Sequence, residues 1–187
     1  MPRPPRELVP SGRYHVIGRG TGGALLFRDS ADRNHFLKLF GRSVNRFRWI
    51  CLAYCVLGTH YHLFVETPEP NLDRGMHALL GPYAQAFNRR HGRFGHLVAE
   101  RYTALRVDGE QHTLAVLRYI ALNPVVAGLC EKPEQWLWSS YGATIGMRTP
   151  PAFLDAERVV SWFGRPPAAW RRIRELVEGS LPSRDGV

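Results

Sequence analysis

The sequence has few cysteines, almost no lysine and no long apolar run. Its three cysteines, Cys51, Cys55 and Cys130, include no CxxC pair, which argues against a disulfide framework and against a zinc ribbon. No apolar segment approaches the roughly 20 residues that cross a bilayer, and the opening MPRPPRELVP lacks the apolar core of a signal peptide. These absences predict a cytoplasmic protein with no membrane partner.

The length and composition predict one folded domain with a short appendage. The chain has 187 residues, of which 44% are hydrophobic, so it can bury one core but is too short for two ordinary domains. After residue 142 the sequence turns to glycine, threonine and proline. We therefore expect a core domain over residues 1–142 and a helical tail over residues 143–187.

Basic charge is concentrated in the first part of the chain. The formal net charge is +9, and residues 1–50 hold ten Arg or Lys against three Asp or Glu, whereas residues 51–100 hold four of each. Basic side chains gain free energy by displacing counterions from nucleic acid, which makes nucleic acid the favoured partner. A merely solvated basic surface is the alternative, because all but two of the 25 basic residues are arginine and codon bias can produce that without a function.

Hydrophobic periodicity predicts alternating strands and helices. Strands are expected over residues 14–20, 47–57, 60–67 and 101–107, and helices over residues 32–45, 72–90 and 110–122. Pro124 should end or kink the last of these helices. The order β-α-β-β-α-β-α predicts an α+β fold, a ferredoxin-like antiparallel sheet with helices packed on one face. Two further helical stretches, 155–163 and 168–177, make up the C-terminal helical tail.

His60-Tyr61-His62 is the strongest candidate for a metal site. In a strand, residues i and i+2 point to the same face, so the two imidazoles can converge on one ion, and Glu66 shares that parity. The spacing alone also fits two ordinary half-exposed histidines. Their position directly after a tight turn, on an otherwise apolar strand, favours a site.

The third predicted helix carries a candidate nucleophile and a candidate oxygen ligand. Tyr119 and Asn123 are four residues apart, so a helix places the phenol and the amide on one face. The alternative for Tyr119 is a core aromatic, because Leu117 and Ile120 lie close to it in sequence. Tyr83 on the second helix is the rival nucleophile, although it falls in an apolar stripe and has no oxygen or nitrogen ligand one turn further on.

Six segments together resemble a known family of transposases. They are YHVIGRG, LAYCVLGTHYHLFVET, YAQAFNRRHGRFGHL, ERYTALRV, RYIALNPVVAGL and WLWSSY, and they span roughly residues 10–142. These segments are similar to those of the REP-associated tyrosine transposases (RAYT), relatives of the insertion-sequence transposases in the HUH group of single-strand nucleases. An HxH after an apolar strand, followed much later by YIxxNPxxAGL, is a specific combination. The chain departs from the family's pattern at Thr59, Tyr61 and Ala99-Glu100, which puts the substrate loops in doubt.

The resemblance implies a metal-dependent, single-strand DNA endonuclease and transposase. His60 and His62 would hold Mg²⁺ or Mn²⁺, with Asn123 as the third ligand, and Tyr119 would be the nucleophile that forms a 5′-phosphotyrosine. The implied partner is single-stranded or hairpin DNA, REP-like in kind, which would associate the protein with the nucleoid. The arginines expected to bind nucleic acid are Arg13, Arg19, Arg89, Arg90, Arg93 and Arg101.

Two alternative functions and the oligomeric state stay open at this point. The first alternative is a domesticated protein that binds hairpin DNA but no longer cleaves it. The second is an unrelated metalloenzyme that uses the HxH pair on a small molecule, which the basic front half and the lack of further convergent histidines in the sequence disfavour. A monomer and a homodimer fit the resemblance equally.

Overall fold

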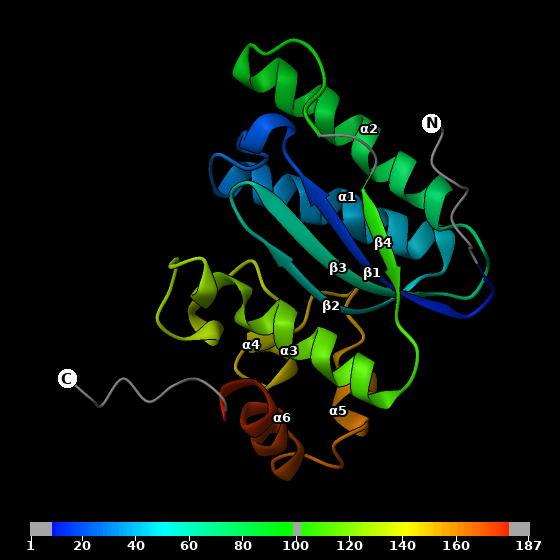
Figure 1. Cartoon of the computed structure of the whole chain (residues 1–187), viewed down its shortest axis with the longest axis vertical. Coiled ribbons are helices and arrows are strands. Elements are labelled where there is room, and N and C mark those ends of the chain that lie inside the picture. The colour runs from blue at the N-terminus through cyan, green and yellow to red at the C-terminus, as the bar shows by residue number, and fades with distance from the viewer. Residues whose placement is uncertain (1–8, 99–101, 180–187) are drawn as a thin grey trace.

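The protein folds into a sheet with layers of helices, as described by a computed structural model for residues 9–98 and 102–179 (Figure 1). The strands are β1 (Gly12–Arg19), β2 (Ile50–Val56), β3 (His60–Thr67) and β4 (Thr103–Arg106). The long helices are α1 (Ser30–Phe47), α2 (Leu72–His91) and α3 (Glu110–Val126). The shorter elements are α4 (Tyr141–Thr144), α5 (Ala156–Ser161), α6 (Ala168–Glu178) and the 3₁₀ turns η1 (Thr21–Gly23) and η2 (Pro133–Gln135). The predicted order of strands and long helices is confirmed, as are the two helices of the tail.

The four strands form one antiparallel sheet in the order β2-β3-β1-β4. The α+β class is thus confirmed, and the chain order of strands and helices is the ferredoxin-like one. β1 and β3 are neighbours at the centre of the sheet. Their register sets His15 opposite Phe64, Ile17 opposite His62 and Arg19 opposite His60. Side chains of β1 therefore lie beside the HxH pair.

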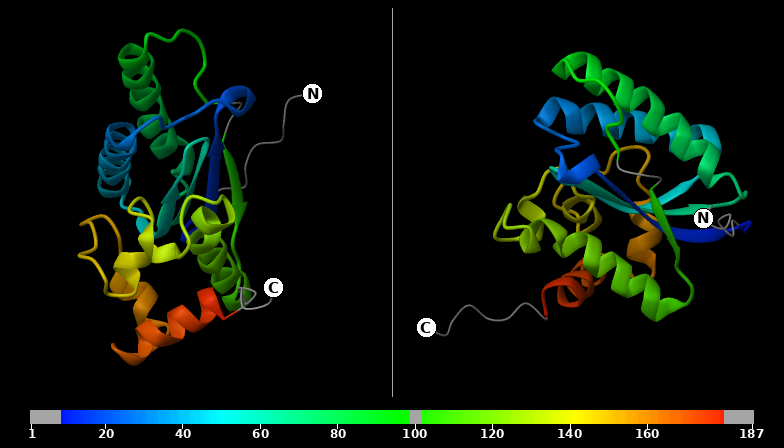
Figure 2. Two further views of the ribbon diagram at one scale, coloured as in Figure 1. Left: turned by 90° about the vertical axis from the view of Figure 1, so that its left-hand side faces the viewer. Right: turned by 45° about the horizontal axis from the view of Figure 1, so that its top comes forward.

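Helices cover both faces of the sheet, and the prediction of helices on one face was wrong. Tyr61, Leu63 and Val65 of β3 pack with α1 and α2 on one face, whereas Phe64 packs with α3 and with Val159 of α5 on the other. Figure 2 shows these layers from two further directions. The physical reason is that β2 and β3 are buried along almost their whole length, and a strand that is apolar on both sides needs a cover on each.

Helix α3 continues past Pro124 to Val126, so the proline does not end the helix. A proline removes its own N–H from the hydrogen-bond ladder but leaves its carbonyl available. The amide of Ala127 donates to the carbonyl of Asn123, and the amide of Leu129 donates to the carbonyl of Pro124, each over 2.9 Å. Asn123 is therefore held in the last turns of the helix.

Helix α6 packs on the side of α3 that faces away from the sheet, and α5 packs against β2 and α6. Ala121 and Leu122 of α3 form a small core with Val160 of α5 and with Ile173 and Val177 of α6. Helix α3 is thereby fixed between the sheet and the tail. None of the helices in the described part of the chain combines the length and the apolar character that a membrane span requires.

Candidate functional site

The HxH pair begins β3 and faces the C-terminal half of α3. His60 is the first residue of the strand, directly after the turn at Gly58 and Thr59. Its ring nitrogen Nε2 lies 3.2 Å from Oδ1 of Asn123, and its Nδ1 lies 3.0 Å from Oγ1 of Thr59. The structure thus brings together one histidine and the amide that sequence analysis assigned to the same ion.

His62 is buried beneath His60. The two ring centroids are 5.1 Å apart, and the His62 side chain has no exposed surface. Its Nδ1 lies 2.9 Å from Nε2 of His15 on the neighbouring strand. Its other nitrogen, Nε2, is buried and has no hydrogen-bond partner among the described residues. A buried nitrogen without a partner costs free energy, and a cation bound at this atom would remove that cost.

Tyr119 lies beside the histidines and reaches the surface. Its ring meets His62 edge-on with centroids 5.3 Å apart and meets His15 at 5.8 Å. The residue is 50% exposed, so it is not the core aromatic that its neighbours in sequence permitted. Tyr83, the rival nucleophile, is 1% exposed, and its hydroxyl donates to the carbonyl of Leu26 over 2.5 Å. A phenol enclosed in this way cannot reach a polymer substrate.

Burial keeps the histidines of the site neutral. It lowers the pKa of His62 to about 3, with further lowering by His15, His60 and Arg19. Burial and then the charge of His112 lower the pKa of His15 to about 4. The pKa of His60 is also lowered by burial, although its hydrogen bond to Asn123 opposes the shift. Neutral imidazole is the form that binds a metal ion, so these side chains could bind one at neutral pH without first losing a proton.

The donor set fits a divalent cation held by two imidazole nitrogens and one amide oxygen. Among residues 9–98 and 102–179, no three His, Cys, Asp or Glu side chains are grouped to hold an ion, and the amide oxygen of Asn123 beside His60 is a third possible donor. The unpartnered Nε2 of His62 is a free donor of the required kind. A set of three leaves coordination positions open for substrate and water.

Glu66, which shares the parity of the HxH pair, takes no part in this site. Its carboxylate accepts from Nε of Arg13 over 3.1 Å and from Arg158 over 2.9 Å. Arg13 also lies over the ring of Trp162, 5.3 Å from its centroid. These contacts tie the sheet to α5. Arg13 is therefore engaged within the protein, at the opposite end of β1 from Arg19.

The other arginines predicted to bind DNA differ in whether their side chains are paired within the fold or exposed. Arg90 pairs with Asp29 and with the buried Asp32, so its charge is used within the fold. Arg19 and Arg89 are exposed and Arg93 is partly exposed, and within the described ranges none of the three makes a hydrogen bond or an ion pair with another side chain. Arg101 lies outside the described residues.

The segment after α2 is joined to the end of β1 that carries Arg19. The amide of Thr21 donates to the carbonyl of Leu97 over 3.2 Å, and Gly20 pairs with Val98 in a short bridge. Arg19 lies opposite His60 in the register of β1 and β3, and its charge helps to lower the pKa of both histidines of the pair. A free cation is thus placed within electrostatic range of the site.

Sequence analysis missed His15. The expectation that no further histidine converges on the HxH pair was wrong, because His15 contacts both His62 and Tyr119. The available signal was its place in the first predicted strand, at the same parity as Arg13 and Arg19. That signal could not be used, since the sequence does not say which strand lies next to the one with the HxH pair.

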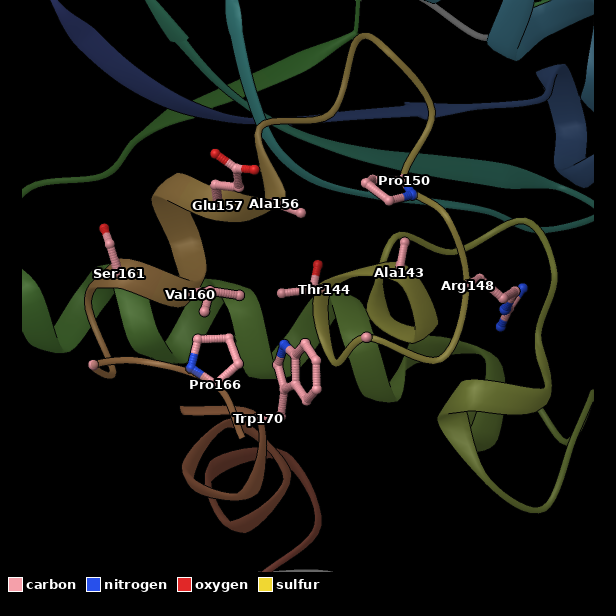
Figure 3. A pocket seen from close by; sticks show the side chains of 12 residues that line it. Ala143, Thr144, Arg148, Pro150, Ala156, Glu157, Val160, Ser161, Pro166 and Trp170 are labelled. Atoms are coloured by element: carbon pink, nitrogen blue, oxygen red, sulfur yellow. The ribbon is translucent and has the colours of Figure 1, made fainter. Parts of the chain in front are cut away.

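Three cavities in the described part of the chain lie away from these residues. One cavity of about 450 Å³ lies between α4, α5 and α6, and Val160, Pro166 and Trp170 point into it (Figure 3). Further cavities of about 410 Å³ and 360 Å³ adjoin the start of β2 and the start of β1. None of these three is lined by the HxH pair, Tyr119 or Asn123. The candidate site instead opens to solvent beside Tyr119, which suits a polymer better than an enclosed small molecule.

No protein-family model matches the chain, and no curated protein matches it. Among solved structures, the chain is similar to that of a REP-associated tyrosine transposase bound to a REP hairpin, with a TM-score of 0.68 and 14% sequence identity over 82% of this chain and 90% of that one.

Two other solved structures are less similar. One is a Deinococcus radiodurans R1 protein assigned as a transposase, with a TM-score of 0.45 and 17% identity over 68% of this chain and 97% of that one. The other is tRNA(His) guanylyltransferase from Saccharomyces cerevisiae, with a TM-score of 0.48 and 11% identity over 94% and 82%. Scores this low support no argument. What the first comparison establishes is that this chain has the fold of a REP-associated tyrosine transposase.

Proposed function

We propose that the chain is a transposase of the REP-associated tyrosine type, which binds hairpin DNA and cleaves a single strand with Tyr119 as its nucleophile. The observation that carries the proposal is the meeting of two imidazoles, one amide and one exposed phenol at the junction of β3 and α3. The shared fold supports it. Fold alone does not specify chemistry, which depends here on these four side chains.

His60, His62 and Asn123 would hold Mg²⁺ or Mn²⁺ through two ring nitrogens and one amide oxygen. When bound, such an ion supplies Lewis-acid polarisation of the scissile phosphate and stabilises the charge that builds up in the transition state. Imidazole suits transition metals better than Mg²⁺. We therefore expect Mn²⁺ to support the faster reaction.

Tyr119 would make the covalent bond to DNA. Its phenolic oxygen attacks phosphorus, the bond from phosphorus to the 3′ oxygen breaks, the phenol gives up its proton and the departing oxygen takes one up. The products are a 5′-phosphotyrosine and a free 3′-OH. A phenol is a weak nucleophile at neutral pH, which is why the electrophile must be activated. Attack by a second 3′-OH reverses the step and joins strands without ATP.

Arg19 would bind a phosphate next to the scissile one. It is exposed, makes no ion pair within the described ranges and stands opposite His60 in the sheet. Arg89 and Arg93 near the end of α2 would extend this contact along the DNA backbone. A single strand or the unpaired part of a hairpin fits best, because its phosphate can approach the half-exposed Tyr119 directly. The protein would act in the cytoplasm, at the nucleoid when bound to DNA.

A covalent adduct tests the proposal. Labelled single-stranded hairpins from the protein's own genome are incubated with the wild type and Mn²⁺, and the products are separated on a denaturing gel. We expect a protein–DNA band that carries label from the fragment downstream of the cut, which is joined to the protein through its 5′ phosphate, and no such band with Tyr119→Phe, which removes one oxygen and little volume. Both proteins should shift the hairpin equally on a native gel.

Tyr83→Phe is the matched control. It also deletes one phenolic oxygen, but from a buried ring whose hydroxyl bonds to the carbonyl of Leu26, so the adduct should persist. An adduct that is lost with Tyr83→Phe and kept with Tyr119→Phe would move the nucleophile to Tyr83. If the wild type binds hairpins but never forms an adduct, the protein is a domesticated hairpin-binding protein.

A further inference from the structure

His15 touches both the proposed buried ligand, His62, and the proposed nucleophile, Tyr119, and has itself been assigned to neither role. Its Nε2 lies 2.9 Å from Nδ1 of His62, and its ring lies 5.8 Å from that of Tyr119. The residue is 5% exposed. β1 places it there, because Ile17 lies opposite His62 in the β1–β3 register and His15, two residues earlier on the same face, lies diagonally across from His62. It therefore lies under the site and not at its surface.

The contact between the two histidines has two possible hydrogen arrangements. If His62 carries its hydrogen on Nδ1, it donates to Nε2 of His15, and its own Nε2 keeps a free lone pair. If His15 donates instead, the hydrogen of His62 must sit on Nε2. That atom is buried and finds no acceptor among the described residues, and a bound cation can satisfy a lone pair there but cannot satisfy an N–H. The first arrangement is therefore the favoured one.

The favoured arrangement is also the one that a metal ligand needs. A histidine that binds an ion through one nitrogen commonly donates its other N–H to a neighbouring acceptor, which fixes the tautomer and the orientation of the ring. The acceptor is most often a carboxylate or a backbone carbonyl. Here it would be a second imidazole, held by the strand next to that of the ligand.

We propose that His15 is a positioning residue of the metal site, which accepts the Nδ1–H of His62 and so directs the Nε2 lone pair of His62 at the ion. The inference rests on the proposed function, since it takes His62 as a ligand. It adds a residue that neither binds the ion nor reacts. By its contact with Tyr119, His15 also supports the ring of the nucleophile from below.

The tautomer of His62 gives a test that needs no substitution and no activity. Long-range nitrogen–proton NMR correlations on the metal-free wild type at neutral pH distinguish an Nδ1–H from an Nε2–H imidazole. We expect His62 to be the Nδ1–H tautomer and His15 to have an unprotonated Nε2. An Nε2–H tautomer of His62 would overturn the proposal.

Metal affinity gives the second test. Free and bound Mn²⁺ are measured by electron paramagnetic resonance, without DNA, for the wild type, His15→Phe and His15→Gln. The Phe variant keeps a ring of similar size but has no acceptor, and its Mn²⁺ dissociation constant should rise by about 10- to 100-fold, as for other partners of metal-binding histidines. The Gln variant places an amide oxygen near the former Nε2, and its affinity should return to within a few-fold of wild type.

The outcomes separate this proposal from the proposed function. Equal Mn²⁺ affinity in wild type and His15→Phe would overturn the role of His15 while leaving the ligands in place. A loss that His15→Gln does not reverse would point to packing, and would also overturn it. A wild type that binds no Mn²⁺ yet shifts hairpins would instead refute the metal assignment. Circular dichroism and hairpin binding of each variant serve as checks that the fold is kept.

Discussion

His60 and His62 share one face of β3 but have different surroundings. His60 is partly exposed and contacts Asn123 and Thr59, whereas His62 is fully buried and contacts His15. Replacing His62 therefore disturbs the core as well as the site. His60 is the cleaner position at which to test the metal assignment.

His60→Ala should reduce the cleavage of a single-stranded hairpin by at least about 100-fold, because it removes one of three proposed ligands of the activating ion. Hairpin binding on a native gel should stay within a few-fold, because arginine–phosphate contacts supply most of the affinity. Chelation of the wild type with EDTA should mimic the variant, and added Mn²⁺ should restore only the wild type. Cleavage at the wild-type rate by His60→Ala would rule out this site.

The position of α2 depends on a close contact between a glycine and a tryptophan. A Cβ on Gly75 would overlap the indole ring of Trp49. That ring cannot turn away easily, because its Nε1 donates to Oδ1 of Asn71 over 2.6 Å. The Asn71 side chain is held in turn, because its Nδ2 donates to the carbonyl of Phe47 over 3.2 Å. The contact joins the start of α2 to the end of α1 and to the sheet.

Gly75→Ala should lower the free energy of unfolding by about 1–3 kcal/mol, since it overfills a packed contact. Gly81→Ala lies in the same helix with no atom near its new Cβ. Alanine has a higher helix propensity than glycine, but a residue that precedes proline is disfavoured in a helix once it carries a Cβ. The free energy of unfolding of Gly81→Ala should therefore stay within about 0.5 kcal/mol of the wild type. Urea unfolding of both variants measures the difference. If the two are equally stable, Trp49 does not fix α2.

At the scale of the whole molecule, the proposed binding of DNA depends on which arginines are free and which are paired within the fold. Arg89 and Arg90 are adjacent in sequence, yet Arg90 is paired with Asp29 and Asp32 and Arg89 is exposed without a partner among the described residues. A phosphate contact by a free arginine releases a counterion, whereas a paired arginine must first lose its carboxylates. The two neighbours therefore form a natural comparison.

Arg89→Ala should weaken hairpin binding and reduce the slope of log affinity against log salt by about 0.7–0.9, the value of one phosphate contact. Arg90→Ala should leave that slope unchanged and lower the urea midpoint instead, because it opens the contact between α1 and α2. Titrations at two salt concentrations beside urea unfolding separate the effects. A reduced slope for Arg90→Ala alone would reverse the assignment.

Hairpin or single-stranded DNA should also bind more tightly than a blunt duplex of the same length. The reason is that an unpaired backbone can bring its phosphate to Tyr119 and its bases to the surrounding surface. Competition on a native gel at fixed salt measures the preference. Equal affinity for duplex and hairpin, with no salt dependence, would favour a small-molecule metalloenzyme over a transposase.

The sequence by itself determined the features that depend on local geometry. β3 begins and ends at the predicted residues, and the parity of His60 and His62 follows from the two-residue period of a strand. The one-turn relation of Tyr119 to Asn123 follows from the period of a helix. The fold class could be predicted because the hydrophobic pattern indicates the order of strands and helices.

Only the tertiary structure decided which distant residues meet. His15 and His62 are 47 residues apart in sequence, and His60 and Asn123 are 63 apart, so these contacts depend on which strands and helices become neighbours. The same is true of the second helical layer, which the burial of β2 and β3 on both faces requires. Periodicity indicates on which face of an element a side chain lies, but packing and ion pairing between separate segments decide which residues contact it.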